Sequence, residues 1–327
     1  MFLTKRGGSK VPFRDRQRGV ALITAMLVVA LATLLAVNMV SRQQFDIHRT
    51  ANLLHAEQAR LYHYAIEDHA TPLLQSYWEQ LEFLTREQYE QFAAISSVGY
   101  QEEIEGGWVS AELLMDLQAR FNLNNLIGAE GRANPAAIEQ FKRLLTLLKL
   151  DSDPIDAIID WLDSDMEVTF PNGAEDLAYM SDNGGGYRTP NRSMVDLEEL
   201  RLVYGVEQAW FDTLKPYIAA LPSGSKININ WATVEILQSI SDKISAMDAE
   251  DIITRRTEAA FESLEEVGQH TAFKDKAIDL GQIQVSSDYF LLQTAVQIAH
   301  VQRLWQSLLY KTPQEVVQVI LRTREFN

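Results

Sequence analysis

The sequence contains no cysteine. If the protein is exported, disulfides cannot stabilise it, and its stability must come from a buried apolar core or from a bound metal. With 327 residues, 46% of them hydrophobic, the chain can form a sizeable core. This length is typical of about one to three domains.

Charged side chains are missing from Val20 to Val40, a run of 21 residues. As a helix this run would measure about 32 Å, which matches the roughly 30 Å hydrocarbon core of a membrane. A secretory signal has a shorter apolar region of about 7–15 residues, followed by a cleavage site. We therefore expect the segment to be retained as a single-pass anchor.

The residues before this run are basic, and the rest of the chain is acidic. Residues 1–19 carry Asp15 against six basic residues, a local charge of +5: Lys5, Arg6, Lys10, Arg14, Arg16 and Arg18. The formal net charge is -16, so the remainder carries -16 minus 5, or -21. The basic leader places the N-terminus in the cytoplasm and the body on the other side of the membrane. The acidity of the body argues against nucleic acid as a partner.

The basic leader ends in RQRG, immediately before the apolar run. This arrangement resembles the prepilin class, and the resemblance implies cleavage by a prepilin peptidase between Gly19 and Val20, with N-methylation of Val20. The fifth residue after the cut is usually Glu in that class, where it is thought to neutralise the N-terminal amine of a neighbouring subunit. Here it is Thr24. Because an unpaired charge in an apolar bundle is costly, a subunit without this Glu suits a special position.

The helical pattern continues beyond the membrane. No Pro or Gly occurs from Ser41 to His69, so one helix is expected from Val20 to about Ala70, with Pro72 as its first breaker. Its apolar face includes Phe45, Leu54 and Leu61, and we expect partners to grip the helix there. Four histidines, spaced too loosely for a zinc site, are expected to be exposed: His48, His55, His63 and His69.

The body combines strands at both ends with helices between them. Gly106-Gly107 marks a hairpin, helical patterns fill residues 128–279, and alternating patterns return from Gln282. This order predicts an α+β fold in which helical material interrupts one sheet. FNLNNL and VDLEELRLVYG are echoed by ININWATVEIL and ESLEEVGQH. Such units resemble helix-hairpin-helix modules, but the acidity of the body favours simple packing over DNA binding.

Several motifs occur together in one order: RQRG with VALITAMLVVALAT, DPIDAIIDWLDSD, NGAED, YRTPNRSMVDLEELRLVYG and KININWATVEIL. The chain resembles the protein K family of large minor pseudopilins from type II secretion systems. A departure is Trp231, where an Asn-Thr pair is commoner. The resemblance implies a pilin-like β-sheet with a large inserted helical domain behind a transmembrane and stalk helix. The expected domains are a leader (1–19), the transmembrane and stalk helix (20–71), the first part of the pseudopilin domain (72–127), the helical insert (128–280) and C-terminal strands (281–327).

The resemblance also implies a place and partners. The protein would sit in the bacterial inner membrane with its body in the periplasm, at the tip of the pseudopilus. There it would help to start filament assembly and to export folded proteins across the outer membrane. Its partners would be the other minor pseudopilins (types I, J and H), the inner-membrane assembly platform and the prepilin peptidase.

Lys and Arg are absent between Lys149 and Arg188, a stretch that holds ten acids. Asp163, Asp165 and Glu167 alternate as at the start of a calcium loop, although the positions that would complete an EF-hand are not filled. A solvated acidic loop explains this spacing equally well. The family resemblance, whose members can bind calcium in the inserted domain, favours the metal. It adds Glu175, Asp176 and Asn191 as ligands, with Asp182 and Asn183 behind them.

We do not expect an enzyme. A single-span periplasmic metal-dependent hydrolase that uses the acidic cluster is the alternative, but no His, Lys or Arg lies nearby in the sequence to tune its carboxylates. Cleavage of the leader distinguishes the pseudopilin from the hydrolase, because a filament subunit must lose its leader and an anchored enzyme need not.

Mass spectrometry of the membrane-extracted protein should therefore find Val20 at the N-terminus, carrying one added methyl group. Replacing Gly19 with a bulky residue should block cleavage, because the peptidase must approach the backbone closely at that position. An intact Met1, or cleavage after Val40, would contradict the prepilin interpretation.

Overall fold

A computed structural model describes residues 16–81, 85, 99–180, 186–274, 276 and 278–325. The chain divides into two units, residues 1–58 and 59–327. The proposed leader lies largely outside the described residues, and the Gly19-Val20 bond lies within the first helix.

The first unit consists of the N-terminal part of helix α1, which runs from Arg16 to Leu81. Within the part of the chain that the structure describes, α1 alone is long and apolar enough to cross a membrane. Its two hydroxyl groups in the apolar run are satisfied inside the helix. Thr24 donates to the carbonyls of Val20 and Ala21, and Thr33 donates to that of Val29. Such internal bonds are what polar groups need where water is absent.

The helix passes through Pro72 and ends at Leu81, beyond the expected stop near Ala70. Proline removes one intrahelical hydrogen bond and costs about 3 kcal/mol in a free helix. Here the helix is held by packing on both sides of the proline, because Ile66 and Leu74 are buried in the same apolar cluster. Tertiary packing therefore overrides the local signal.

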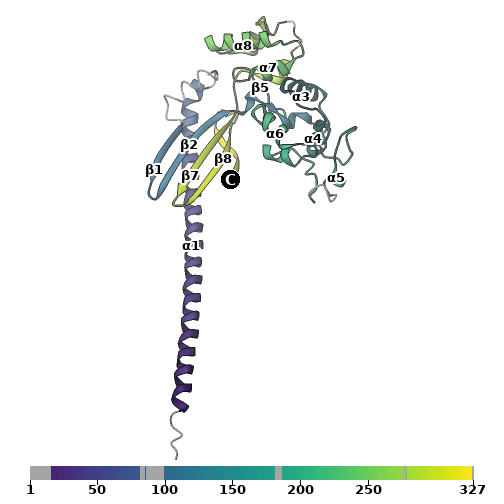
Figure 1. Ribbon diagram of the computed structural model, residues 1–327. Helices are drawn as coiled ribbons and strands as arrows, with labels where there is room; N and C mark the ends of the chain where they lie inside the picture. The colour runs from purple at the N-terminus through teal and green to yellow at the C-terminus, as the bar shows by residue number, and fades with distance from the viewer. Residues whose placement is uncertain are drawn as a thin grey trace, which may run out of the picture. The chain divides into compact units, whose positions relative to one another are not determined.

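The second unit contains a five-stranded antiparallel sheet against which α1 packs from Ala59 onward (Figure 1). The strand order is β1-β2-β7-β8-β9. Their bounds are β1 Gly99–Ile104, β2 Gly107–Asp116, β7 Tyr289–Ile298, β8 Val301–Lys311 and β9 Val317–Glu325. Side chains of β7 alternate between buried and half-buried, as in a strand with one face on a core. The expected α+β fold with an interrupted sheet is confirmed.

Residues 117–288 form the insert, because β2 pairs directly with β7. The boundaries expected from the sequence, 128 and 280, lie inside this segment. Its helices are α3 Pro135–Leu148, α4 Pro154–Leu162, α5 Asp176–Met180, α6 Gln208–Leu214, α7 Val234–Ile240, α8 Ala246–Glu258 and α9 Leu264–Gln269. The described residues of the insert also contain the 3-10 turns η1 Leu117–Ala119, η2 Leu123–Leu126, η3 Leu197–Leu202, η4 Lys215–Tyr217 and η5 Leu280–Gln282.

The repeated sequence motifs of the insert correspond to two halves with the same arrangement of strand pairs and asparagine hydrogen bonds. In the first half β3 (Phe121–Asn122) pairs in parallel with β4 (Ile218–Ala219), and in the second β5 (Ile227–Asn228) pairs in parallel with β6 (Ile283–Gln284). The matching asparagines Asn124 and Asn230 make matching bonds. Each amide group donates to two carbonyls of distant segments, Met194 and Leu221 for the first and Phe261 and Val285 for the second.

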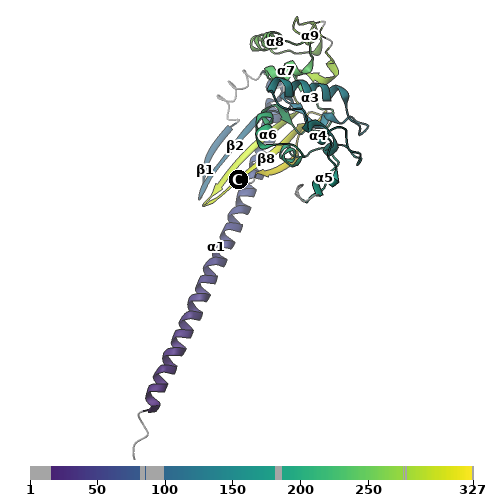
Figure 2. The ribbon, with the colours of Figure 1, turned by 45° about the vertical axis from the view of Figure 1, so that its right-hand side comes forward.

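The helix starts in the two halves are also capped alike. Glu199 accepts from the backbone of Val195 in the first half, and Glu266 accepts from that of Glu262 in the second. Figure 2 shows α9 beside α8, where Arg255 pairs with Glu266. The halves are thus internal duplicates, each closed by a buried asparagine and a capped turn.

A buried polar network joins α1 to the sheet. The expectation that the stalk histidines are exposed is wrong for His63, which is 1% exposed and stacks on Trp305 with centroids 4.9 Å apart. Its Nδ1 lies 2.7 Å from Thr294 Oγ1, and its Nε2 lies 3.1 Å from Glu67 Oε1. Glu67 also accepts hydrogen bonds from Ser307 and from Arg322 Nε, the latter 2.8 Å from Oε2. The sheet-facing side of α1 is therefore partly polar, which an apolar stripe cannot reveal.

Glu67→Ala should lower the free energy of unfolding by about 2–3 kcal/mol. Removing one member of a buried charged network costs about 3–5 kcal/mol, and Arg322, which is half exposed, can regain water. The measurement is urea unfolding of the full chain in detergent, followed by tryptophan fluorescence. Asp68→Ala, an exposed neighbour on the same helix, is the matched control and should change little. Equal effects of the two substitutions would show that the network contributes nothing.

Candidate metal centre

Three carboxylates converge at the loop that follows α4. Single oxygens of Asp163, Asp165 and Glu175 all lie within 4.8 Å of one another. Asp163 directly follows α4 as its C-cap residue, and its backbone N–H donates to the carbonyl of Ile159. Because α4 is buried along most of its length, the position of Asp163 is fixed by the core. Glu175 directly precedes α5 and is placed by its buried neighbours Ala174 and Tyr179.

A tight turn brings the chain back from Asp165 to Glu175. The fully buried Asp160 accepts from the backbone N–H of Thr169 at 2.9 Å, and Gly173 donates to the carbonyl of Thr169 at 2.7 Å. A side chain at Gly173 would place its Cβ 2.3 Å from Asp160 Oδ2. Only glycine therefore fits here. We did not predict this role of Asp160 and Gly173, although the glycine in NGAED was a signal for it.

The cluster combines buried carboxylates with acceptor atoms that have no hydrogen-bond partner. Asp163 and Glu175 are only 7% and 6% exposed, and Asp163 Oδ1, Glu175 Oε1 and Asn191 Oδ1 are buried with no hydrogen-bond partner. Burial, with the charges of Asp165, Asp160 and Glu175, raises the pKa of Asp163 to about 6. Burial and the charge of Asp160 also raise the pKa of Glu175, partly offset by the hydrogen bond from Thr189. Buried acceptors left without donors are costly unless something positive binds among them.

The other predicted ligands lie nearby in different settings. Asn191 donates from Nδ2 to the carbonyl of Asp165, which places its amide at the cluster. The carboxylate of Asp176 accepts from Thr189 N and Oγ1 at 3.1 and 3.0 Å and pairs with Arg188 at 3.4 Å. Glu167 is exposed and donates its backbone N–H to Asp165 Oδ1. Asp182 and Asn183 lie outside the described residues.

The donor set fits a hard divalent cation. Carboxylate and amide oxygens in a loop that contains glycine are the ligands Ca²⁺ prefers, at a coordination number of about 6–8. Asp163, Asp165, Glu175 and the Asn191 amide oxygen would supply the protein ligands at the centre of the cluster. The calcium site and its full ligand set stay a prediction.

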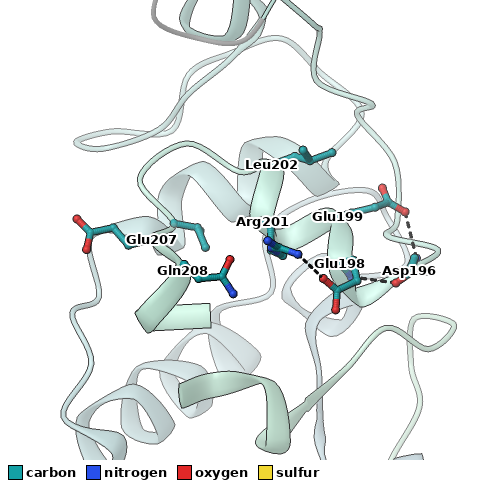
Figure 3. Close-up of a pocket in the computed structure, with 8 residues that line it drawn as sticks. Asp196, Glu198, Glu199, Arg201, Leu202, Glu207 and Gln208 are labelled. Atoms are coloured by element: carbon teal, nitrogen blue, oxygen red, sulfur yellow. Dashed lines mark hydrogen bonds and ion pairs between the residues drawn. The ribbon is translucent and has the colours of Figure 1, made fainter. Parts of the chain in front are cut away.

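A separate hollow of about 510 Å³ lies between η3 and the start of α6 (Figure 3). Three of its four acids are engaged, and the fourth, Glu207, is exposed. Glu198 is paired with Arg201 at 3.1 Å and with Lys215 at 2.7 Å, and Asp196 and Glu199 form a capping box. Neither His nor Ser is among the eight described residues that line it. The three engaged carboxylates stabilise a turn.

The comparisons with known proteins agree in pointing to one family. The model of "Type II secretion system (T2SS), protein K" matches residues 119–223 and 227–286, the two halves of the insert. The chain is 31% identical over 316 residues to type II secretion system protein K of Pseudomonas aeruginosa, covering 94% of this chain and 93% of the relative. It is 28% identical over 327 residues to the protein of that name from Pectobacterium carotovorum, with 94% and 97% coverage.

The fold resembles a solved structure as well. A chain from the crystal structure of the GspK-GspI-GspJ complex of enterotoxigenic Escherichia coli superposes with a TM-score of 0.70. That match covers 85% of this chain and 100% of the other, at 21% sequence identity. At this identity the likeness is one of fold.

Adding Ca²⁺ to chelator-treated protein should raise its melting temperature by about 5 °C or more at saturation, since a ligand that binds only the folded state stabilises it by mass action. Asp163→Asn should abolish most of this rise. It should also raise the melting temperature of the metal-free protein, because it removes a buried charge. Asp242→Asn, which removes an exposed charge far along the chain from the loop, should change neither value.

The rise should also depend on pH. Because the pKa of Asp163 is about 6 in the folded chain and near 3.8 when unfolded, protonation favours the folded metal-free state as the pH falls through 6. Protons compete with calcium for the same oxygen, so the calcium-induced rise should shrink between pH 7.5 and pH 5. If neither calcium nor chelator changes the melting temperature, the acidic cluster is a solvated loop and not a calcium site.

Proposed function

The chain belongs to the family of type II secretion system protein K, the minor pseudopilins that its sequence resembles, and we propose that it forms the tip of the periplasmic pseudopilus. In this role it helps to start the filament, which pushes folded proteins through an outer-membrane channel. Its body lies in the periplasm, and its N-terminal helix anchors it in the inner membrane. The observation that carries the tip position is the size and attachment of the helical insert.

The insert leaves and rejoins the sheet at one end of a single strand pair. Asp116 at the end of β2 lies opposite Phe290 near the start of β7, and residues 117–288 lie between these strands in sequence. The insert is thus a bulky head attached at one end of the sheet. In a tightly packed helical fibre, a head of this size leaves no room for the next subunit along the side. At the tip nothing follows, and the head is accommodated.

Thr24 supports the same position. A subunit inside the fibre needs a carboxylate near this level of the helix to pair with a neighbour's N-terminal amine. Thr24 instead uses its hydroxyl within its own helix, at 3.0 Å from the carbonyl of Ala21. A subunit at the end of the series avoids the cost of an unpaired amine.

The partners we propose are the other minor pseudopilins, first of all types I and J. The related fold was solved in a complex with GspI and GspJ. The stalk offers exposed apolar side chains for helix packing, among them Phe45, Leu54 and Leu61. We extend the proposal to type H, to the assembly platform in the inner membrane and to the prepilin peptidase that acts at Gly19-Val20.

The protein is proposed to be structural and not an enzyme. Its relatives are named as secretion system proteins. The acidic cluster, which the hydrolase alternative would use, is better explained as a calcium site that orders the loop of the head. Calcium is therefore proposed as a stabilising ligand with no part in a reaction.

The tip position predicts where labelled copies lie. Gold or fluorescent labels on the insert should mark one end of each pseudopilus and leave the shaft bare. Thr24→Glu should still insert in the membrane, whereas the reverse change, Glu to Thr at the same position of the major pseudopilin, should cripple assembly, because an unpaired amine there costs several kcal/mol. Labels spread along the shaft at many copies per fibre would contradict the tip position and the bulky-head argument.

A further inference from the structure

Large apolar side chains are exposed along the loop that carries the candidate metal centre. Phe170 is 90% exposed and Leu177 is 86% exposed, and Met166, Val168 and Met180 are each more than half exposed. Buried residues of the same segment, such as Trp161 and Tyr179, show that the core beneath is complete. Exposed apolar patches of this kind on an otherwise polar surface mark interaction sites.

Two backbone hydrogen bonds fix the turn that carries Phe170. The backbone N–H of Asn172 donates to Asp156, and that of Thr169 donates to Asp160, so the turn that carries Phe170 is tied to α4. The carboxylates of Asp165 and Glu175 approach within 4.8 Å. This approach brings Met166, which follows Asp165, close to the stretch that begins α5 and contains Leu177. The five exposed side chains all lie on the segment from 166 to 180, which is here called the loop patch (Met166, Val168, Phe170, Leu177 and Met180).

The charge around the loop patch selects the class of partner. Exposed apolar residues alternate with acids, as in Asp165-Met166 and Glu167-Val168, and no Lys or Arg occurs from 150 to 187. A second copy of this acidic body, an anionic lipid surface and a nucleic acid would all be repelled. A surface with Lys or Arg beside apolar side chains would be attracted and could bury both.

We propose that the loop patch is a docking surface for a protein segment in which basic and apolar side chains alternate or share one helix face. This goes beyond the tip position, since it assigns to the head a contact of its own outside the filament.

The test uses the full chain in detergent and an immobilised amphipathic peptide of Leu and Lys. Phe170→Ser with Leu177→Ser should weaken binding about tenfold or more, since two large apolar contacts are lost. Met247→Ser, at an apolar residue 79% exposed on α8, is the matched control and should leave binding unchanged. Melting temperatures of the variants establish that each is folded.

Two further peptides decide the chemistry. A Leu/Glu peptide of the same pattern should not bind, and a Ser/Lys peptide should bind far more weakly than Leu/Lys. Equal binding of Ser/Lys would reduce the effect to counterion attraction and overturn the proposal, as would unchanged binding by the Phe170/Leu177 variant. Binding that is lost in that variant but kept by the Met247→Ser control would uphold the docking surface.

Discussion

The pairing of β2 with β7 is the constraint on which the second unit depends. Val109 faces Val296 across this pair, although the whole insert separates them in sequence. Because both ends of the insert are held on neighbouring strands, the insert must fold back on itself and bury its own apolar residues. It does so around a core that includes Phe141, Leu144 and Ile236, while the sheet and α1 share a second cluster that Trp231 of the insert joins.

Within this constraint the two halves of the insert use the same structural elements. A short parallel strand pair closes each half, and a buried asparagine ties the half together by bonding carbonyls about 70 and 97 residues away in the first copy. A buried amide that makes all its hydrogen bonds favours one arrangement of the chain, because leaving one of these bonds unmade is costly. The same device in both copies explains how a helical domain with few long helices closes reproducibly.

The acidic loop shows the opposite balance of forces. Its carboxylates are brought together by packing of α4 and by the turn at Gly173, and no basic residue lies in that segment to neutralise them. Such an arrangement is unfavourable as bare charge, and a bound cation would remove the penalty. The exposed apolar residues of the same loop are explained if the head, besides ending a filament, meets a partner of opposite charge.

The sequence alone determined the features that depend on residues close along the chain. The apolar run of Val20 to Val40, the basic leader, the hairpin at Gly106-Gly107, the helical insert and the acidic stretch were all legible, because length, charge and turn chemistry are local properties.

The tertiary structure alone decided what depends on distant residues. Glu67 meets Ser307 and Arg322 across some 240 and 255 positions, so nothing near His63 in the sequence shows that it is buried. Asp163 and Glu175 converge only because α4 is fixed by the core and Gly173 lets the loop close on Asp160, whereas Asp176 is diverted to Arg188 and Thr189. Contacts over such separations are set by tertiary packing, which the pattern of residues along the chain does not reveal.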